Sequence, residues 1–541
     1  MSATSFPPSP PSPDVSPARP WHAAWPAHVP RAIDYPSAPA WWLLEQNVAR
    51  WSSRVAIREV DHATLTERRV LAYEDLFRAV RGIAAGLGAR GIGRGDRVGL
   101  CLPNGADLIA GYYATWYAGG VAVPANPVAN ESEVEQQLTD AQVSLVVAPG
   151  GSAAARVCER LGRPTVDLAA FREMESLPPG KPADCAPEDD VAVLLYTGGT
   201  TGVPKGAMLT HRNIVTNTLQ FARWYAFAPG EETSICAIPM YHSGGMSGVM
   251  NVPLSAAATL LVFSRFNAGA VAASAGAHRV TRLFGVPTMF IALLNDDAGR
   301  RADYSHLRAC RTNAAPLPPS VKAAFDELVG RPVLVEGYGL TETSPLTHAN
   351  PIERAKPGAI GVPLPDTDAR IVDVDSGADV SPGVPGELLI RGPQVMRGYW
   401  RRDDATAAAI RDGWLYTGDV AVMDGEGYFA IVDRKKDVIN TAGFKVWPRE
   451  VEEVLYQHPG IKLAAVVGTP DDYRGEAVKA YVVLKESHDG RVTEREVIDF
   501  CRARLTAYKA PRSVDFRTEL PVSGAGKMLR RVLRDANAAA R

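Results

Sequence analysis

Short apolar segments bounded by turn-forming residues alternate with helix-like segments along most of the chain. The apolar segments include residues 55–60, 97–103, 191–198 and 259–266, and residues 73–91 form a helix-like stretch between the first two. This alternation is typical of layered α/β structure. We therefore predict an α/β fold for most of the chain.

The pattern changes near Asp366. Residues 369–393 and 420–434 contain short apolar runs separated by Asp-Gly and Pro-Gly pairs, which indicate turns between β-strands. Beyond Asp437, two helix-like and two strand-like segments predict a small α+β unit of about 100 residues.

These patterns predict the domain organisation of the chain. The expected parts are a flexible Pro- and Ser-rich tail over residues 1–20, a large N-terminal domain over 21–435 with a β-rich subdomain at about 366–435, and a small, mobile C-terminal domain over 436–541. We find no internal repeat of 20 to 50 residues in the sequence.

Charge and composition exclude several classes of protein. The 58 Lys and Arg residues and 60 Asp and Glu residues leave a net charge of −2, which gives the whole chain no attraction for nucleic acid. Residues 108–130 and 233–264 lack charged side chains over lengths that could span a membrane. Their prolines and glycines favour a buried core instead, so we expect no transmembrane segment.

Cysteine spacing and the N-terminus indicate the compartment. The six cysteines are far apart and include no C-x-x-C pair, so neither a zinc site nor a disulfide framework is predicted. The first twenty residues contain seven prolines and no apolar run, unlike a secretory signal. We expect a cytoplasmic protein.

A glycine- and threonine-rich loop follows the apolar segment at residues 191–195. Glycines let backbone amides approach an anion closely, threonines add hydroxyl donors, and a lysine adds a cation, so the loop predicts phosphate binding. Its candidate residues are Thr197, Gly198, Gly199, Thr200, Thr201, Gly202 and Lys205. No G-K-[ST] follows at the Walker spacing. The alternative is a solvated glycine-rich turn.

Three further segments contain residues suited to a nucleotide. After the apolar segment PVLV, Tyr338 offers a flat face to a base, Thr341 offers a hydroxyl, and Glu342 offers a hard oxygen ligand for magnesium. Asp419 could accept hydrogen bonds from two ribose hydroxyls, although an Asp in a turn is usually a cap. Lys527 lies on a glycine-rich segment near the C-terminus. We expect the neighbouring Arg530 and Arg531 at the solvated start of a helix.

Five motifs in this order resemble the adenylate-forming superfamily, which includes acyl-CoA synthetases, adenylation domains and luciferases. They are YTGGTTGVPKG, GYGLTET, YTGD, VDRKKDVINTAGFKVWPREVE and the terminal GKMLRR. Within the superfamily, the chain is most similar to bacterial long-chain fatty-acyl-CoA synthetases. The resemblance covers about residues 21 to 534.

The resemblance implies a two-step ligase reaction that uses ATP, Mg²⁺ and coenzyme A. A carboxylate attacks the α-phosphorus of ATP to give acyl-AMP and pyrophosphate, and the coenzyme A thiol then displaces AMP. A fatty acid with a pKa of about 4.3 is already ionised at neutral pH, so the first step needs no general base. It needs charge neutralisation at the phosphate oxygens.

The resemblance also implies a role for each candidate residue. The residues from Thr197 to Lys205 would hold the β- and γ-phosphates. Thr341 would contact the α-phosphate, Glu342 would bind magnesium, Gly337 would bind the nucleotide, and Tyr338 would lie along the adenine. Asp419 and Arg434 would bind the ribose, and Lys527 would bind the acyl carboxylate and the α-phosphate. His242 would border the acyl carboxylate, Lys436 would be the domain hinge, and Gly443 would leave room for the pantetheine arm.

Two departures from the family pattern leave the acyl substrate open. Asn313 stands where many relatives have a glycine beside the acyl path, and Met246 stands where some long-chain relatives have a gating tryptophan. We therefore expect a small-molecule carboxylic acid that is long-chain, medium-chain, cyclic or aryl. A peripheral membrane contact and the choice between monomer and homodimer also stay open.

Two rival functions remain compatible with the sequence. One is a fatty-acyl-AMP ligase that passes its adenylate to a carrier protein, although no insertion is visible between Asp419 and Gly443. The other is a catalytically inactive relative that binds a nucleotide or an acyl group. The intact Glu342, Asp419, Arg434 and Lys527 argue against the second.

Overall fold

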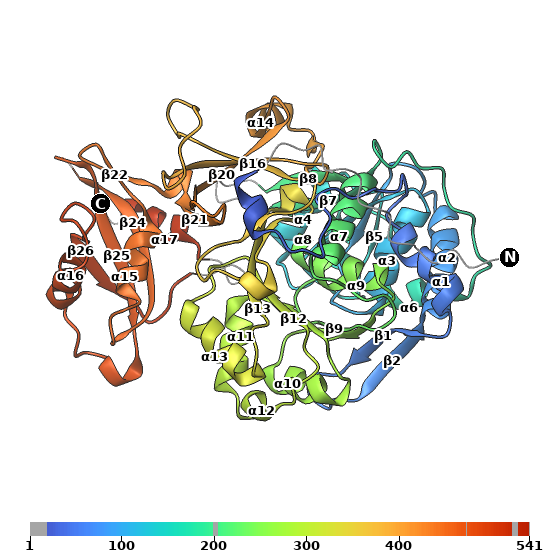
Figure 1. Ribbon diagram of the computed structural model, residues 1–541. Helices are drawn as coiled ribbons and strands as arrows, with labels where there is room; N and C mark the ends of the chain where they lie inside the picture. The colour runs from blue at the N-terminus through green and yellow to red at the C-terminus, as the bar shows by residue number, and fades with distance from the viewer. Residues whose placement is uncertain (1–18, 198–203, 472, 522–527, 540–541) are drawn as a thin grey trace. The chain divides into compact units, whose positions relative to one another are not determined.

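The computed structural model describes residues 19–197, 204–471, 473–521 and 528–539 (Figure 1). Contacts divide the chain into two compact units. Unit 1 comprises Met1–Asp368, Ile390–Leu415 and Glu426–Tyr428, and unit 2 comprises Ala369–Leu389, Tyr416–Gly425 and Phe429–Arg541. Sheets and helices alternate through both units, which confirms the predicted α/β class. Of the tail predicted over residues 1–20, only the last two residues are described.

The larger sheet of unit 1 has the strand order β15-β14-β13-β12-β11-β9-β10-β1-β2. Its strands are β1 (Val55–Val60), β2 (Glu67–Ala72), β9 (Thr233–Cys236), β10 (Thr259–Val262), β11 (Arg282–Gly285), β12 (Ala309–Thr312), β13 (Leu334–Gly339), β14 (Leu346–Ala349) and β15 (Val362–Pro363). The run from β13 through β12, β11, β9 and β10 to β1 is parallel. The carboxyl ends of these strands therefore meet at one edge, where ligands bind in open α/β sheets.

The second sheet of unit 1 has the order β18-β8-β7-β4-β3-β5-β6. Its strands are β3 (Arg97–Leu100), β4 (Val121–Pro124), β5 (Leu145–Val147), β6 (Thr165–Val166), β7 (Val191–Thr197), β8 (Lys205–Thr210) and β18 (Gly398–Tyr399). Strands β3 to β7 pair in parallel, whereas β8 is antiparallel to both β7 and β18.

The helices of unit 1 lie between and around these strands (Figure 1). They are α1 (Trp42–Trp51), α2 (Tyr73–Gly88), α3 (Ala106–Tyr117), α4 (Glu131–Asp140), α5 (Ala153–Arg160), α6 (Leu168–Glu173), α7 (His211–Trp224), α8 (Ser243–Gly245), α9 (Val252–Ser255), α10 (Ala268–Ala277), α11 (Pro287–Asn295), α12 (Asp297–Arg301), α13 (Pro319–Val329) and α14 (Asp403–Ala409). Short segments are the 3₁₀ helices η1 (Pro20–Ala24), η2 (Met174–Ser176), η4 (Thr341–Thr343) and η5 (Ile352–Arg354), and the π-helical η3 (Met246–Asn251).

Local signals in the sequence explain several of these helices. Helix α7 begins after Thr210, whose side chain accepts a hydrogen bond from the Asn213 backbone and so caps the helix. Helix α3 is buried along its whole length, which explains the first uncharged stretch as core. Within the part of the chain that the structure describes, no helix is both long and apolar enough to cross a membrane.

A third sheet, of order β16-β17-β20-β19 with β21 beside β20, lies in the predicted β-rich region. Its strands are β16 (Asp368–Val372), β17 (Gly386–Arg391), β19 (Ile410–Arg411), β20 (Trp414–Met423) and β21 (Phe429–Arg434). The fourth sheet has the order β23-β22-β25-β24, with β26 beside β25. Its strands are β22 (Ile439–Thr441), β23 (Phe444–Val446), β24 (Ile461–Asp471), β25 (Gly475–Leu484) and β26 (Ser513–Phe516).

Helices cover the fourth sheet and complete the core of unit 2. They are α15 (Pro448–Leu455), α16 (Glu494–Arg502) and α17 (Arg530–Ala539), with the 3₁₀ helices η6 (Lys435–Asp437) and η7 (Glu486–His488). Val451 and Leu455 of α15 pack with Val497 and Cys501 of α16 and with alternate residues of β24 and β25. The apolar face of each helix therefore faces the sheet.

Candidate active site

The ends of the predicted phosphate loop lie opposite each other in unit 1. Thr197 is the last residue of β7, Lys205 is the first of β8, and the two are paired in register. Both side chains are half-buried. A hydroxyl and an ammonium group thus stand at the base of the loop. The predicted residues Gly198, Gly199, Thr200, Thr201 and Gly202 lie outside the described residues.

Tyr399 connects the phosphate loop to the second motif. The Lys205 ammonium lies 5.1 Å from the centre of the Tyr399 ring, within the range of a cation–π contact. The Tyr399 hydroxyl donates a hydrogen bond of 2.7 Å to the Glu342 carboxylate. Burial and this carboxylate raise the pKa of Tyr399, which keeps the phenol protonated as a donor. Strand β18 holds Tyr399 opposite Ala207 of β8.

The short helix η4 positions Thr341 and Glu342 next to the same hairpin. It follows β13 at the carboxyl edge of the larger sheet and contacts both β7 and β8. The Thr343 side chain accepts from the Leu340 backbone, and the Met396 backbone donates to the Glu342 carbonyl at 2.8 Å. These hydrogen bonds fix the backbone of η4. Thr341 and Glu342 are both half-buried, so part of each side chain is accessible from the surface.

The donor set at Glu342 fits magnesium. Among the described residues, no three His, Cys, Asp or Glu side chains are grouped so that they could hold a metal ion. Magnesium on a nucleotide is usually held by one or two carboxylates together with substrate phosphates, rather than by a cage of protein ligands. The single carboxylate of Glu342, oriented by Tyr399, is of that kind.

Gly337 and Tyr338 occupy the end of β13. Tyr338 pairs with His348 of β14, and the two rings meet edge to face with centroids 6.0 Å apart. Burial lowers the pKa of His348 to about 3, so this neighbour is neutral. Gly337 is buried, whereas Tyr338 is half-buried. The strand therefore places an aromatic ring directly before the turn that contains Thr341.

His242 lies in the segment between β9 and α8. Its ring centroid is 4.6 Å from that of Tyr241. The residue is exposed, yet the surrounding protein desolvates the ring enough to lower its pKa, so it is neutral at pH 7. A Cβ on Gly244 would lie 3.3 Å from the Asn313 amide nitrogen. The His242 segment thus runs beside Asn313.

Asp419 and Arg434 come together within unit 2. They are register partners on β20 and β21, and the Arg434 Nε lies 2.8 Å from an Asp419 carboxylate oxygen. Asp419 is buried, whereas Arg434 is partly exposed. Two residues that are 15 apart in sequence therefore form one charged pair at the end of a β-hairpin.

Lys436 and Gly443 flank the start of the fourth sheet. Burial and the nearby Arg434 lower the pKa of Lys436, which lies in η6. Gly443 and Ala442 form the two-residue turn between β22 and β23, with φ of +85° and +51°. A Cβ at Gly443 would meet no described atom within 4 Å. Space is open there, and the positive φ favours glycine.

The structure corrects the expectation for Arg530. Its side chain is only 17% exposed and lies 2.7 Å from Glu452, 3.2 Å from Asp433 and 3.5 Å from Asp437. These carboxylates outweigh the effect of burial and raise its pKa. Arg530 is thus a buried anchor at the first turn of α17, not a solvated residue. Lys527, three residues earlier, lies outside the described residues.

Sequence reasoning missed Tyr399. It lies in a strand of two residues that is remote from every motif, and no local pattern distinguished it from other tyrosines. Within unit 1, Tyr399 contacts both Lys205 and Glu342, and Lys205 is the register partner of Thr197. Within unit 2 it joins Asp419, Arg434 and the η6 segment.

Comparison with known proteins identifies similar chains and structures. A family model described as "AMP-binding enzyme" matches residues 44–400, and one described as "AMP-binding enzyme C-terminal domain" matches residues 450–527. A long-chain-fatty-acid–CoA ligase of Bacillus subtilis (strain 168) is 38% identical over 95% of this chain and 97% of its own length.

Two further proteins extend this comparison. A feruloyl-CoA synthase of Amycolatopsis sp is 39% identical over 90% of this chain and 98% of its own. The crystal structure of ATP-bound MatB from Rhodopseudomonas palustris superposes with a TM-score of 0.83 at 30% identity, over 93% of this chain and 100% of that one. Nearly the whole chain is therefore similar to these proteins.

Proposed function

The chain belongs to the family of AMP-binding enzymes, and we propose that it is an ATP-dependent, AMP-forming carboxylate–CoA ligase. It converts a fatty or other hydrophobic carboxylic acid to its acyl-CoA through an acyl-AMP intermediate. The observation that carries this proposal is the connection of Lys205 to Glu342 through Tyr399, because it unites the two phosphate motifs within one unit.

The first step is governed by charge. We assign the β- and γ-phosphates to Lys205 and the Thr197 hydroxyl, which are paired at the base of the loop, and the α-phosphate to Thr341 on η4, which contacts the same hairpin. Glu342 would hold magnesium, which would supply further positive charge to the phosphate oxygens. The Tyr399 hydroxyl fixes the orientation of the Glu342 carboxylate. Because the acid is already ionised, none of these residues must remove a proton.

The nucleoside and the acyl carboxylate need the remaining residues. We assign Gly337 and Tyr338 to the adenine, Asp419 and Arg434 to the ribose, and Lys527 to the acyl carboxylate and α-phosphate. The buried Asp419 carboxylate, aligned by Arg434, supports the ribose assignment because it presents a fixed acceptor. His242 is assigned to the border of the acyl carboxylate. Its lowered pKa supports a neutral, positional role.

The second step uses the small C-terminal domain, for which we keep the boundary between residues 435 and 436. The two family matches leave residues 401–449 between them, which is compatible with this boundary. Lys436 would be the hinge, and the open space at Gly443 would admit the pantetheine arm of coenzyme A. Since ATP and coenzyme A are its substrates, we also propose a cytoplasmic location.

A panel of carboxylic acids tests the function. The chain is incubated with ATP, magnesium, coenzyme A and each acid, and both AMP and acyl-CoA are measured. We expect the two products in equal amounts with at least one hydrophobic acid. The Lys527→Ala variant should lower acyl-AMP formation by on the order of 10²-fold, as for loss of one preorganised cation, with Arg531→Ala as the matched control.

Each other outcome of this panel has a distinct meaning. Acyl-AMP without acyl-CoA would identify an enzyme that transfers to a carrier protein. No AMP with any acid would identify an inactive relative. Unchanged pyrophosphate exchange in Lys527→Ala would contradict the role of Lys527 alone.

A further inference from the structure

Arg311 of β12 is a buried cation for which the described residues supply no counter-charge. The residue is 1% exposed, and none of its three guanidinium nitrogens has a hydrogen-bond partner among the described residues. Its guanidinium lies 4.5 Å from the centre of the Phe221 ring and 5.5 Å from that of Phe284. Burial lowers its pKa to about 10, so the group is still charged at neutral pH.

Aromatic stacking alone does not satisfy this side chain. Contact with two rings stabilises a cation, but it leaves five N–H donors without acceptors. Buried charges in proteins are otherwise paired, because an isolated charge in an apolar interior is strongly unfavourable. Among the described residues, therefore, no anion neutralises Arg311.

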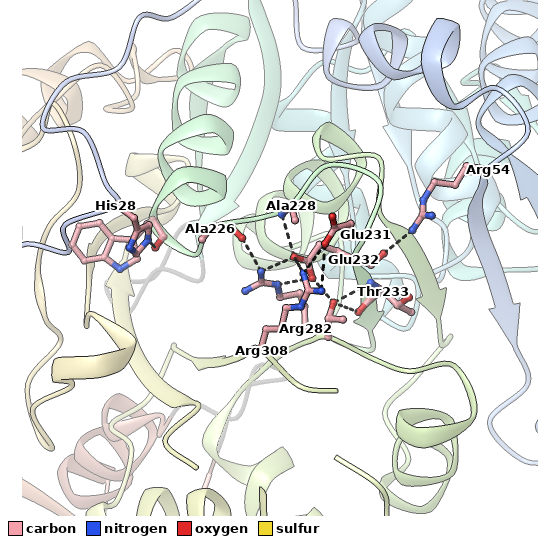
Figure 2. Close-up of polar contacts among 11 residues, drawn as sticks. His28, Arg54, Ala226, Ala228, Glu231, Glu232, Thr233, Arg282 and Arg308 are labelled. Carbon is pink, nitrogen blue, oxygen red and sulfur yellow. Dashed lines mark hydrogen bonds and ion pairs between the residues drawn. The ribbon is translucent and has the colours of Figure 1, made fainter. Parts of the chain in front are cut away.

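The neighbouring strand contains a buried arginine whose charge is neutralised within the chain. Arg282 of β11 is also buried, and its guanidinium donates to both oxygens of Glu232 at 2.7 and 3.0 Å (Figure 2). The Ala228 backbone, Arg308 and the Thr281 hydroxyl also donate hydrogen bonds to the same carboxylate. Arg311 has no such arrangement in the described chain.

Two glycines border Arg311 on the side of the candidate active site. A Cβ on Gly248, in η3, would lie 3.1 Å from Nη2, and a Cβ on Gly337 would lie 3.4 Å from Cδ. Gly337 directly precedes Tyr338, and η3 follows the segment that begins with His242. Two residues beyond Arg311, Asn313 lies beside Gly244. The Arg311 side chain thus packs against β13 immediately before Tyr338, and its guanidinium packs against η3, which follows the His242 segment.

Local structure at this point also indicates a binding function. Segment η3 is π-helical over Met246–Asn251, and such irregular turns within helices occur frequently at functional sites. The hydroxyl of Tyr225 is buried, has no hydrogen-bond partner among the described residues and interacts electrostatically with Arg311. A second donor is therefore available near the cation.

We propose that Arg311 binds a second carboxylate at the far end of the acyl substrate, so that the preferred acids are dicarboxylic acids with an apolar middle. This inference rests on the proposed ligase function. A guanidinium binds a carboxylate through two parallel hydrogen bonds, which a plain fatty acid cannot supply. The rings of Phe221 and Phe284, which flank the guanidinium, would contact the apolar part of such an acid next to its second carboxylate.

Matched pairs of acids test the proposal. Each pair has the same carbon number and consists of an n-alkanoic acid and the corresponding α,ω-dicarboxylic acid, from short to long chains. The specificity constant, kcat/KM, is measured by AMP release for the wild type, Arg311→Met, Arg311→Lys and Arg308→Met. Arg308 is a matched control because it is a half-exposed arginine that directly precedes β12.

The expected result is a change in preference. The wild type and Arg308→Met should prefer the dicarboxylic acid at the best chain length by on the order of 10²-fold, because a site built for hydrogen bonds rejects the partner that lacks them. Arg311→Met should reverse this preference. Arg311→Lys keeps the charge but loses the two-point geometry, so its preference for the dicarboxylic acid should lie between those of the wild type and Arg311→Met. It replaces Arg311→Met in the test if that variant does not fold.

A binding measurement without ATP separates this proposal from the ligase function. The dicarboxylic acid should raise the melting temperature of the wild type and not that of Arg311→Met. If monocarboxylic acids are preferred by the wild type at every length, or if Arg311→Met lowers both acids by the same factor, the proposal is overturned while the ligase function stands. If no acid releases AMP, the ligase function fails and the melting-temperature shift alone decides whether Arg311 binds a dicarboxylate.

Discussion

Two buried arginines on adjacent parallel strands have opposite electrostatic surroundings. Arg282 of β11 and Arg311 of β12 each lie 4.5 Å from the centre of a phenylalanine ring, Phe227 and Phe221 respectively. Phe284 is the register partner of Arg311 and lies two residues after Arg282, so both arginines project from the same face of the sheet. They differ in that, among the described residues, a carboxylate pairs with Arg282 and none pairs with Arg311.

Arg282 is a buried charge that supports the fold, whereas we propose that Arg311 is a buried charge that binds a ligand. Glu232 is fully buried and accepts hydrogen bonds from Arg282, Arg308, the Ala228 backbone and the Thr281 hydroxyl. These bonds lower its pKa against the effect of burial. The cluster is complete without any other molecule. Around Arg311 the described residues provide aromatic faces and a phenol, but no acceptor with a negative charge.

Removing the paired arginine gives the largest expected effect. Arg282→Met leaves Glu232 buried with the half-exposed Arg308 as its remaining described cation, so the free energy of unfolding should fall by about 3–5 kcal/mol. Urea denaturation followed by circular dichroism measures this change. The control Arg308→Met removes a 46% exposed partner and should cost about 1 kcal/mol or less. Equal losses in both variants would contradict the distinction.

The sequence was sufficient for elements with strong local signals. The apolar segment predicted at residues 55–60 is β1, and the helix-like stretch predicted at residues 73–91 contains α2, Tyr73–Gly88. Asp419 and Arg434 were selected for one ligand, and the structure places them opposite each other on a hairpin. In each case hydrophobic periodicity or a motif carries the information within a few residues.

The rest depends on contacts that no local pattern encodes. Arg311 stands in the unremarkable strand sequence ACRT, and its importance comes from the lack of a described partner after folding. Tyr399 reaches Glu342 across 57 residues of sequence. Arg530 was expected in solvent because basic residues at a helix start usually lie there, yet three carboxylates from other elements surround it. Such pairings follow from tertiary packing alone.

Removing the unpaired arginine should have a smaller effect of the opposite sign. Arg311→Met replaces an unneutralised charge by an apolar side chain of similar length, so the free energy of unfolding of the ligand-free chain should rise by about 1–3 kcal/mol. The same urea titration measures it. A decrease of that size would mean that Arg311 supports the fold as Arg282 does, and the comparison would break down.

The pH dependence of that stability difference is the smallest effect and identifies its cause. Burial lowers the pKa of Arg311 to about 10 in the folded chain, below its value in the unfolded chain. Between those two pKa values the unfolded state binds more protons, so the wild type gains stability as pH rises, whereas Arg311→Met has no such group.

The difference between the two proteins should therefore shrink by about 1 kcal/mol from about pH 9 to about pH 11, because other titrating groups cancel in the comparison. Urea titrations of both proteins at each pH measure it. A saturating dicarboxylic acid should abolish the trend, since a paired guanidinium keeps its proton throughout this range. A difference that stays constant with pH in the ligand-free proteins would mean that the charge of Arg311 is already neutralised within the chain.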